Sequence, residues 1–166
     1  MHSDERPAAR VRPMTKGDRR EVAGLIDGVE NFNPAEKECA LELVDIYLED
    51  PEQTDYAFAV ASGGTPGIQA YTCWGPVPLT RGTFDLYWIA TRREARGLGF
   101  GRALVGHVER AIASSGGRLL VAETSAKSSY RNTIEFYRCL GFEEASHIAD
   151  FYDVGDDRLI FVKRIS

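Results

Sequence analysis

Two kinds of hydrophobic pattern follow one another along the chain and predict a mixed α/β fold. Short apolar runs bounded by Gly, Pro or Asp indicate β-strands, and apolar residues three or four positions apart indicate amphipathic helices. The run RLLVAET at 118–124 has the near-continuous hydrophobicity of a buried central strand. The other predicted strands are VRPM at 11–14, YAFAVAS at 56–62, IQAYTCW at 68–74, TFDLYWIAT at 83–91, EEASHIADFY at 143–152 and RLIFVKRI at 158–165.

Capping residues mark where the predicted helices begin and end. Thr15 and Asp18 have the spacing of a capping box, for a helix that runs to about Val29. Two further helices are predicted at 99–114 and at 129–142, and Gly141 is a natural C-terminal cap for the latter. Another helix has an N-cap, a first-turn proline and an acid at Asn33, Pro34 and Glu36, an apolar stripe at Cys39, Leu43, Ile46 and Tyr47, and a stop at Asp50–Pro51.

Composition and charge limit the classes of function. The 166 residues are 43% hydrophobic and 27% charged, as in an ordinary globular protein, and we expect one domain at 10–166 after a disordered lead-in at 1–9. The net charge of -5 argues against nucleic acid as a partner. No apolar run reaches the roughly 18 residues of a membrane span, and the first residues lack the apolar core of a signal peptide. Three widely spaced cysteines suit reduced thiols in a cytoplasm.

Three glycines at alternate positions lie at the start of the predicted helix at 99–114. Gly97, Gly99 and Gly101 allow close approach of the backbone, and a helix start favours a negatively charged ligand. A P-loop is excluded because no Gly-Lys-Ser/Thr follows, and a dinucleotide fingerprint fits badly because Arg102 or Leu104 falls at its third glycine. A tight turn whose glycines serve packing alone remains open.

Other chemistries lack their residues. The chain has no Gly-x-Ser-x-Gly elbow. His107 and Glu109 have the spacing of a zinc deaminase His-x-Glu, but no Pro-Cys-x-x-Cys follows, so we expect an ordinary histidine and no metal. Cys139 has no obvious base beside it, and a structural thiol is the favoured interpretation.

Three segments together resemble the GNAT superfamily of N-acetyltransferases. Arg96, Gly99 and Gly101 fit its acetyl-CoA signature, which is Arg or Gln, two residues, Gly, one residue, and Gly or Ala. FYRCLGF at 136–142 resembles the Phe/Leu-Tyr-x-x-x-Gly-Phe segment of the family's last helix, and VRPMTKGDRREVAGLI at 11–26 resembles its first strand and helix. The resemblance spans about residue 10 to the C-terminus, in the family's order.

The resemblance implies an α/β fold with a mixed, mostly antiparallel central sheet and about four helices. The fourth and fifth strands, at 83–91 and 118–124, would be parallel and splay apart, which leaves main-chain groups for the pantetheine arm of acetyl-CoA. The implied cofactor contacts are Ile89, Ala90 and Thr91 near the acetyl group and the arm, Arg96, Gly97, Leu98, Gly99, Phe100, Gly101 and Arg102 around the pyrophosphate, and Tyr130.

The implied reaction is direct attack of a neutral primary amine on the thioester in a ternary complex, as in acyltransferases of class EC 2.3.1. The family's proton donor to the departing thiolate corresponds to Tyr137, and a phenol with a pKa near 10 keeps its proton at neutral pH. An ordinary core aromatic is the alternative for Tyr137. Tyr130 stands where the family often has Asn, so the role of that Asn is not carried over, and Ser128 or Ser129 is expected to cap the helix.

The base is less defined, and Asp85 and Glu123 are both candidates. Alternation along the strand at 83–91 places Asp85, Tyr87 and Ile89 on one face and Phe84, Leu86 and Trp88 on the other. Glu123 closes the next strand, where the splay opens. Either carboxylate could accept the amine proton directly or through water, and either could equally be a structural partner.

The acceptor is expected to be a small-molecule or peptide amine, without nucleic acid or membrane, and a homodimer is left open. Residues 36–55 hold eight acids and one lysine, which suits a cationic amine, although a solvated helix face explains them as well. A non-catalytic acyl-CoA-binding module is the alternative function. Nucleotide binding without CoA is a third possibility.

Overall fold

The computed structural model describes residues 8–166, so most of the predicted lead-in at 1–9 lies outside the described residues. The chain forms two compact units, the first made of residues up to Trp74 with Trp88–Val108 and the second of Gly75–Tyr87 with Glu109–Ser166. The elements are β1 (Arg10–Pro13), α1 (Arg19–Asp27), α2 (Pro34–Glu49), β2 (Ala57–Gly63), β3 (Thr65–Pro76), β4 (Thr83–Thr91), α3 (Phe100–Ser114), β5 (Leu119–Ser125), α4 (Arg131–Cys139), β6 (Glu143–Asp153) and β7 (Asp156–Arg164).

Every predicted strand and helix is present, and the strands pair in the order β1-β2-β3-β4-β5-β7-β6. Strand β4 contributes residues to both units, and α3 does the same. Within the described residues no helix is both long enough and apolar enough to cross a membrane. The expected fold class, a mixed sheet with one parallel pair and four helices, is confirmed.

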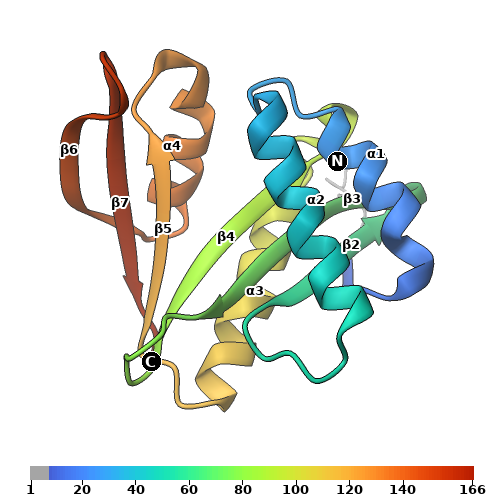
Figure 1. The fold of residues 1–166 in the computed structure, drawn as a ribbon. Helices are drawn as coiled ribbons and strands as arrows, with labels where there is room; N and C mark the ends of the chain where they lie inside the picture. Colours follow the sequence, from blue (N-terminus) through green and yellow to red (C-terminus); the bar gives the residue numbers. More distant parts are fainter. Residues whose placement is uncertain (1–7) are drawn as a thin grey trace, which may run out of the picture. The chain divides into compact units, whose positions relative to one another are not determined.

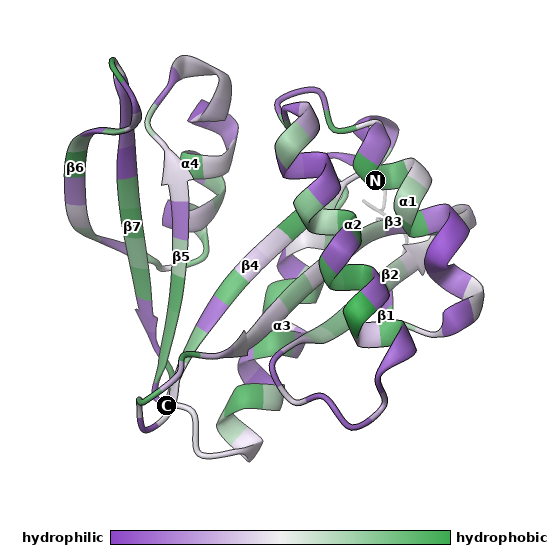
Figure 2. Cartoon of the chain, in the orientation of Figure 1, coloured by the Kyte–Doolittle hydropathy of each residue, from purple (hydrophilic) through white to green (hydrophobic). Residues whose placement is uncertain are grey.

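In the first unit, α1 and α2 cover one face of the β2–β3 sheet, and the beginning of α3 lies on the other face (Figure 1). Alternating hydrophilic and hydrophobic bands along α1 and α2 show that both helices are amphipathic (Figure 2). The predicted stripe of α2 is only partly correct, because Cys39 and Ile46 are exposed. The apolar face between helices and sheet is instead built from Val22, Leu25, Ile26, Ala40, Val44, Phe58, Val60, Tyr71 and Cys73.

The predicted capping box of Thr15 and Asp18 forms, and the predicted N-cap Asn33 and acid Glu36 form a second one. Asn33 Oδ1 accepts from the Glu36 amide at 2.8 Å, and Glu36 Oε2 accepts from the Asn33 amide at 2.7 Å. Asp18 accepts from the Thr15 amide at 2.8 Å and from the Arg12 guanidinium at 2.7 and 2.8 Å. These hydrogen bonds, the one from Arg12 above all, lower the pKa of Asp18 to about 2. The start of the first helical segment is therefore held by a carboxylate that stays ionised.

In the second unit, β5 pairs antiparallel with β7, and β7 pairs antiparallel with the edge strand β6. Helix α4 packs on one face of this sheet, where the ring of Tyr137 contacts that of Phe161 at 5.6 Å. The end of α3 lies on the same face, because Glu109 pairs with Lys163, which shares the side of Phe161 on β7. Within this unit the other face of the sheet carries no helix.

The β4–β5 ladder is parallel and short. It runs from Thr83 opposite Leu119 to Leu86 opposite Ala122 and ends there, whereas β4 continues to Thr91 and β5 to Ser125. The prediction that hydrogen bonding between these strands does not extend along their full length is therefore confirmed. The end of β4 leaves one backbone edge without this partner strand.

The alternation of side chains along β4 is interrupted after Leu86. Val77 donates to the Thr83 carbonyl and Arg92 to the Gln69 carbonyl, so eight steps along β3 correspond to nine along β4. Such an extra residue is the mark of a β-bulge, which turns later side chains to the opposite face. The predicted sharing of one face by Asp85 and Ile89 is therefore wrong.

The start of α4 also differs from the prediction. A 3-10 turn at Ser128–Tyr130 precedes the helix, its N-cap is Lys127, and no side chain caps it. The N-cap of α4 itself is Tyr130, again without a side-chain cap. Neither Ser128 nor Ser129 is thus the predicted cap, because both lie inside the 3-10 turn. The predicted C-terminal glycine is confirmed, since Gly141 follows the helix with φ +84°.

Candidate functional site

The predicted cofactor segment Arg96–Arg102, called the glycine turn below, joins β4 to α3 in the first unit. Gly97 has φ +78° and Gly99 has φ +93°, a backbone region that favours glycine. A Cβ added to either residue would meet no atom within 4 Å. Packing within the described residues therefore does not require a glycine at either position. The geometry leaves open space over a left-handed turn, as needed for close approach of a ligand.

Backbone donors converge at the same turn. No backbone hydrogen bond is made by the amides of Gly97 and Gly99 within the described residues. The Ala103 amide makes the first helical hydrogen bond of α3, to the Gly99 carbonyl at 3.0 Å, so the amides of Phe100–Arg102 have no partner inside the helix. The buried Phe100 ring anchors this helix end in the core. Such a set of outward amides is an anion-binding arrangement.

Charged side chains flank the turn. Arg96 and Arg102 are both exposed, and neither has an ion pair with another described residue. Arg93, just before the turn, is already paired with Glu30 at 2.7 Å. The two guanidinium groups at the turn are therefore available to a negatively charged ligand. Leu98 between them is 39% exposed.

The end of β4 presents alternate amides to its free edge. The Arg92 amide and the Trp88 carbonyl both bond toward β3, to Gln69 and Thr72. Backbone groups alternate in direction along a strand, so those of Ala90 also face β3, whereas those of Ile89 and Thr91 face the opposite edge. Because the ladder with β5 ends at Leu86, the amides of Ile89 and Thr91 are the ones that a ligand strand could pair with.

Tyr137 lies in the second unit and is nearly fully buried, with 4% exposed. Its ring packs against Phe142 at 5.2 Å and Phe161 at 5.6 Å. Burial raises the pKa of Tyr137 well above its usual value. The phenol therefore keeps its proton at neutral pH. Tyr130, the other tyrosine in the predicted site, is half-buried at the end of the 3-10 turn.

Asp85 and Glu123 lie together on the helix-free face of the second unit. Asp85 pairs with Val121 in the parallel ladder, and Glu123 follows on the same side of β5, just beyond the ladder. Burial raises the pKa of Asp85, the Glu123 carboxylate raises it further, and Arg158 partly offsets both. We call the set Asp85, Glu123 and Arg158 the carboxylate face.

Arg158 is a residue of this site that the sequence analysis missed. It forms an ion pair with Glu123, and its guanidinium carbon lies 4.6 Å from the centre of the Phe151 ring. Only the register of β5 with β7, which places Arg158 opposite Ser125, brings it beside Glu123. Alternation along a strand can indicate the face on which Arg158 lies, but not which residue of the next strand lies beside it. Local sequence therefore contained no signal that could have found the pair.

The structure separates Tyr137 from the two carboxylates by the thickness of the sheet. Tyr137 packs on Phe161, which pairs with Ala122 on β5, whereas Glu123 is the next residue and points to the other face. A proton donor and a proton acceptor on opposite faces can act on different atoms of one reaction centre without neutralising each other.

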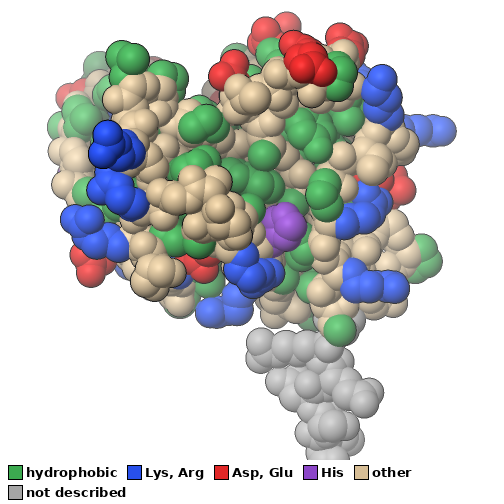
Figure 3. All heavy atoms as spheres, turned by 90° about the horizontal axis from the view of Figure 1, so that it is seen from below, with side chains coloured by type: hydrophobic (Ala, Val, Ile, Leu, Met, Phe, Trp, Pro, Cys, Tyr) green, Lys and Arg blue, Asp and Glu red, His purple; other side chains and the backbone are tan. Residues whose placement is uncertain are grey.

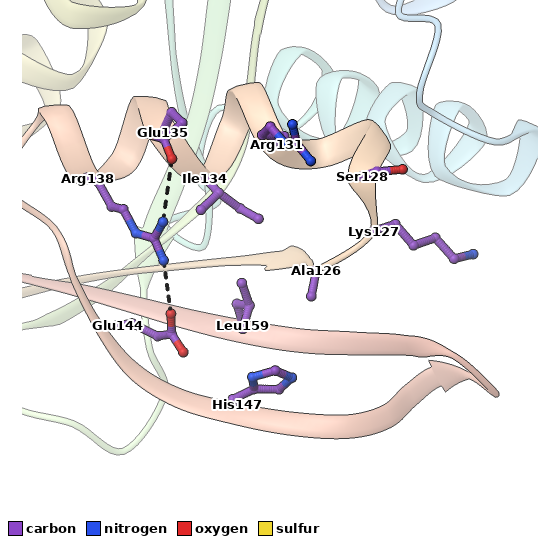
Figure 4. A pocket seen from close by; sticks show the side chains of 10 residues that line it. All are labelled: Ala126, Lys127, Ser128, Arg131, Ile134, Glu135, Arg138, Glu144, His147 and Leu159. Atoms are coloured by element: carbon purple, nitrogen blue, oxygen red, sulfur yellow. Dashed lines mark hydrogen bonds and ion pairs between the residues drawn. The ribbon is translucent and has the colours of Figure 1, made fainter.

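A cavity of about 510 Å³ lies between α4 and the β6–β7 hairpin, apart from these residues (Figure 4). Arg138 crosses it, between Glu135 at 3.5 Å and Glu144 at 3.4 Å. None of the predicted catalytic residues lines it. It is lined by Ala126, Lys127, Ser128, Arg131, Ile134, Glu135, Arg138, Glu144, His147 and Leu159.

We also looked for a metal site and for a continuous basic surface among the described residues. No group of three or more His, Cys, Asp or Glu residues in the described chain is arranged to hold a metal ion. On the face drawn in Figure 3, Lys and Arg side chains lie in several separate groups with hydrophobic side chains between them.

Comparisons with known proteins agree with this arrangement. The family model of the acetyltransferase (GNAT) domain matches residues 54–144. A structure assigned to the GNAT acetyltransferases from Desulfovibrio desulfuricans is 36% identical, covers 96% of this chain and 100% of its own, and has a TM-score of 0.90. A search of curated proteins gives no match.

Two more distant structures share the fold. The ribosomal-protein-S18-alanine N-acetyltransferase of Escherichia coli is 20% identical over 96% of this chain and 95% of its own, with a TM-score of 0.74. An aminoglycoside 6'-N-acetyltransferase in complex with coenzyme A is 14% identical over 95% and 97%, with a TM-score of 0.72. The matched domain and the 36% identical structure together show that the chain belongs to the GNAT family of acetyltransferases.

Proposed function

We propose that the chain transfers the acetyl group of acetyl-CoA to a primary amine by direct attack within a ternary complex. The observation that carries the proposal is the glycine turn, where two left-handed glycines leave open space beside unpaired amides. A turn built for packing alone would place protein atoms in that space. Membership in the GNAT family supports the same conclusion.

The residues present fit the pyrophosphate and pantetheine arm of CoA. The amides of Gly97, Gly99 and Phe100–Arg102 would hold the pyrophosphate, and Arg96 and Arg102 would add positive charge. Ile89 and Thr91 would donate and accept hydrogen bonds with the arm along the free edge of β4, as a neighbouring strand does. We also propose contacts for Ala90, Leu98 and Tyr130.

When bound, acetyl-CoA supplies a thioester whose carbonyl carbon is open to attack by an amine. The amide of Ile89 or Thr91 would stabilise negative charge on the acetyl oxygen. Glu123, which is about half exposed beyond the end of the ladder, would take the proton of the incoming amine directly or through water. Asp85 would act as a second proton acceptor, which takes the proton on from Glu123. Burial raises the pKa of Asp85.

Tyr137 would give its proton to the departing sulfur. The ordinary pKa of a phenol, about 10, already exceeds that of a thiol, roughly 8.5, and burial raises the pKa of Tyr137 further in the free protein, which opposes transfer. A thiolate formed beside the same rings would itself be desolvated, which raises its pKa as well. The two effects partly cancel, so a hydrogen bond from Tyr137 that becomes a proton transfer as charge develops is consistent with its burial.

The acceptor is proposed to be an amine of a small molecule or a peptide. The two more distant structures are named for an aminoglycoside and for a ribosomal-protein alanine, and neither acceptor follows for this chain from a shared fold. The acidic outer side of α2, with Glu38, Glu42 and Glu49, suits a cationic amine. We expect no nucleic-acid or membrane partner and a cytoplasmic location, and the oligomeric state is to be measured by light scattering.

Thiol release from acetyl-CoA, measured against a panel of small amines and peptides, tests the proposal. We expect release that depends on the amine, and calorimetry should show binding of CoA but not of ATP or NAD. Tight CoA binding without release for any amine would instead support an acyl-CoA-binding module. Absence of CoA binding would refute the cofactor assignment.

A further inference from the structure

The carboxylate face holds two acids against one available cation. Asp85 projects from β4 and Glu123 from β5, and the charge of Glu123 raises the pKa of Asp85. The next basic side chain, Lys127, pairs with Asp156 at 3.1 Å, and Ser125 donates to the same carboxylate. By the register of Val77 with Thr83, Gly75 of β3 lies opposite Asp85 and brings no charge. Among the described residues, Arg158 is thus the cation that faces both carboxylates.

Arg158 is held from two sides. Its guanidinium pairs with Glu123 and lies 4.6 Å over the Phe151 ring, and its side chain is 25% exposed compared with 49% for Glu123. Its Nε is buried without a hydrogen-bond partner among the described residues, which is unfavourable for a buried donor. The position of the guanidinium is therefore set by Glu123 and Phe151 rather than by saturation of its own donors.

Phe151 belongs to an exposed part of the β6–β7 hairpin. It is 48% exposed and Tyr152 is 46% exposed, and the two rings are perpendicular with centres 5.0 Å apart. Arg158 already occupies a face of the Phe151 ring, where a ligand cation would otherwise bind. The hairpin is thereby linked to the carboxylate of β5 through one side chain.

We propose that Arg158 is a positioning residue, which fixes the Glu123 carboxylate on the carboxylate face and ties it to Phe151 of the hairpin. The inference rests on the proposed function, in which Glu123 accepts the amine proton. Arg158 does not touch the reacting atoms. It holds Glu123 in one orientation and limits the repulsion between Glu123 and Asp85.

The test compares Arg158→Gln, Arg158→Lys, Glu123→Gln and the double variant Arg158→Gln/Glu123→Gln. Arg164→Gln is the matched control, because Arg164 lies on the same side of β7, is exposed, and has no ion pair with another described residue. Carbon NMR of the Asp side chains gives the pKa of Asp85 in each protein. Thiol release with the best amine of the panel, measured from pH 5 to 9, gives kcat and KM for each.

We expect Arg158→Gln to raise the pKa of Asp85, Glu123→Gln to lower it, and Arg164→Gln to leave it unchanged. The acid limb of kcat/KM should move to higher pH in Arg158→Gln, kcat should fall about 10- to 100-fold, and KM for acetyl-CoA should stay constant. Arg158→Lys should restore the pKa of Asp85 in part, but less of kcat, since lysine keeps the charge and loses the planar contact. The double variant should be no slower than Glu123→Gln alone.

Two results would overturn the inference. One is an unchanged pKa of Asp85 together with unchanged kcat in Arg158→Gln. The other is a double variant slower than Glu123→Gln by the full factor of Arg158→Gln, which would mean that Arg158 acts independently of Glu123. A wild-type protein that releases no thiol with any amine would refute the proposed function instead, and the NMR titration would still decide whether Arg158 acts on the carboxylate pair.

Discussion

The glycine turn and the carboxylate face use the chain in opposite ways. At the turn, the groups offered to a ligand are backbone amides, and the sequence matters chiefly where it omits a side chain, at Gly97 and Gly99. On the carboxylate face the groups are side chains, and their behaviour depends on which strands bring them together. The residues of the glycine turn are contiguous in the sequence, whereas those of the carboxylate face come together only after β4, β5 and β7 have paired.

This difference implies different sensitivities to mutation. The turn should tolerate changes of charge better than an added side chain, because its amides stay in place when Arg96 or Arg102 is replaced. The carboxylate face should respond to the loss of any one charge through the others, because Asp85, Glu123 and Arg158 act on one another. The following experiments compare the two, from the largest expected effect to the smallest.

Replacement of Gly99 should have the largest effect. In Gly99→Val the branched side chain would fill the open space over the turn and would strain a backbone with φ +93°. We expect calorimetry to detect no binding of CoA. Gly116→Val is the matched control, because Gly116 has φ +79° and equally open surroundings but lies outside the turn. If Gly99→Val bound CoA as tightly as the wild type, the turn would not be the cofactor site.

Tyr137→Phe should affect turnover and leave cofactor binding intact. The substitution keeps the ring against Phe142 and Phe161 and removes only the hydroxyl. We expect kcat to fall by roughly 10²–10⁴, the range typical of general acid catalysis, with little change in CoA affinity. The alkaline limb of the pH profile should also change. An unchanged kcat and pH profile, with chemistry shown to be rate-limiting, would point to an ordered water as the proton donor.

The segments that resemble the GNAT family could be recognised in the sequence because they depend on short-range features. The glycine spacing, the two capping boxes and Gly141 each act within a few residues, so the sequence predicted them where the structure has them. Two of the errors came from long-range effects. The bulge in β4 reverses the faces after Leu86, and alternation alone cannot show an inserted residue. Arg158 was missed for the same reason, since strand register is not a local property.

Asp85 offers a prediction on stability as well as on rate. Because burial raises the pKa of Asp85 in the folded state, that state binds its proton more tightly than the unfolded state does. The contribution of this group to stability is then greatest below the unfolded pKa of roughly 3.9 and declines as the pH rises through the folded value. Asp85→Asn should therefore raise the thermal midpoint at pH 7 and slow transfer, by about 10-fold or more if Asp85 is the second proton acceptor.

The matching measurement is the dependence of the midpoint on pH. The wild type should lose stability relative to Asp85→Asn as the pH rises from the unfolded pKa of roughly 3.9 through the higher folded value, and the difference should vanish in acid. Faster transfer by Asp85→Asn at neutral pH, or a lower midpoint, would show that Asp85 is an ordinary structural partner. A loss of stability caused by the partly buried charge of Asp85 would distinguish the carboxylate face from the glycine turn.

The smallest expected effect distinguishes a loss of folding stability, caused by backbone strain, from a loss of CoA affinity. Gly97 has φ +78° and Gly116 has φ +79°, and an added Cβ meets no atom within 4 Å at either position. Alanine at each should therefore destabilise the fold by a similar amount, about 1–2 kcal/mol, because both residues pay the same left-handed strain. Denaturant unfolding measures this term. Only Gly97→Ala should in addition weaken CoA binding, by a few-fold, since a single methyl group partly fills the space over the turn. Equal CoA affinities in the two variants, at equal loss of stability, would mean that Gly97 serves backbone conformation alone and that the close approach of the ligand is confined to Gly99.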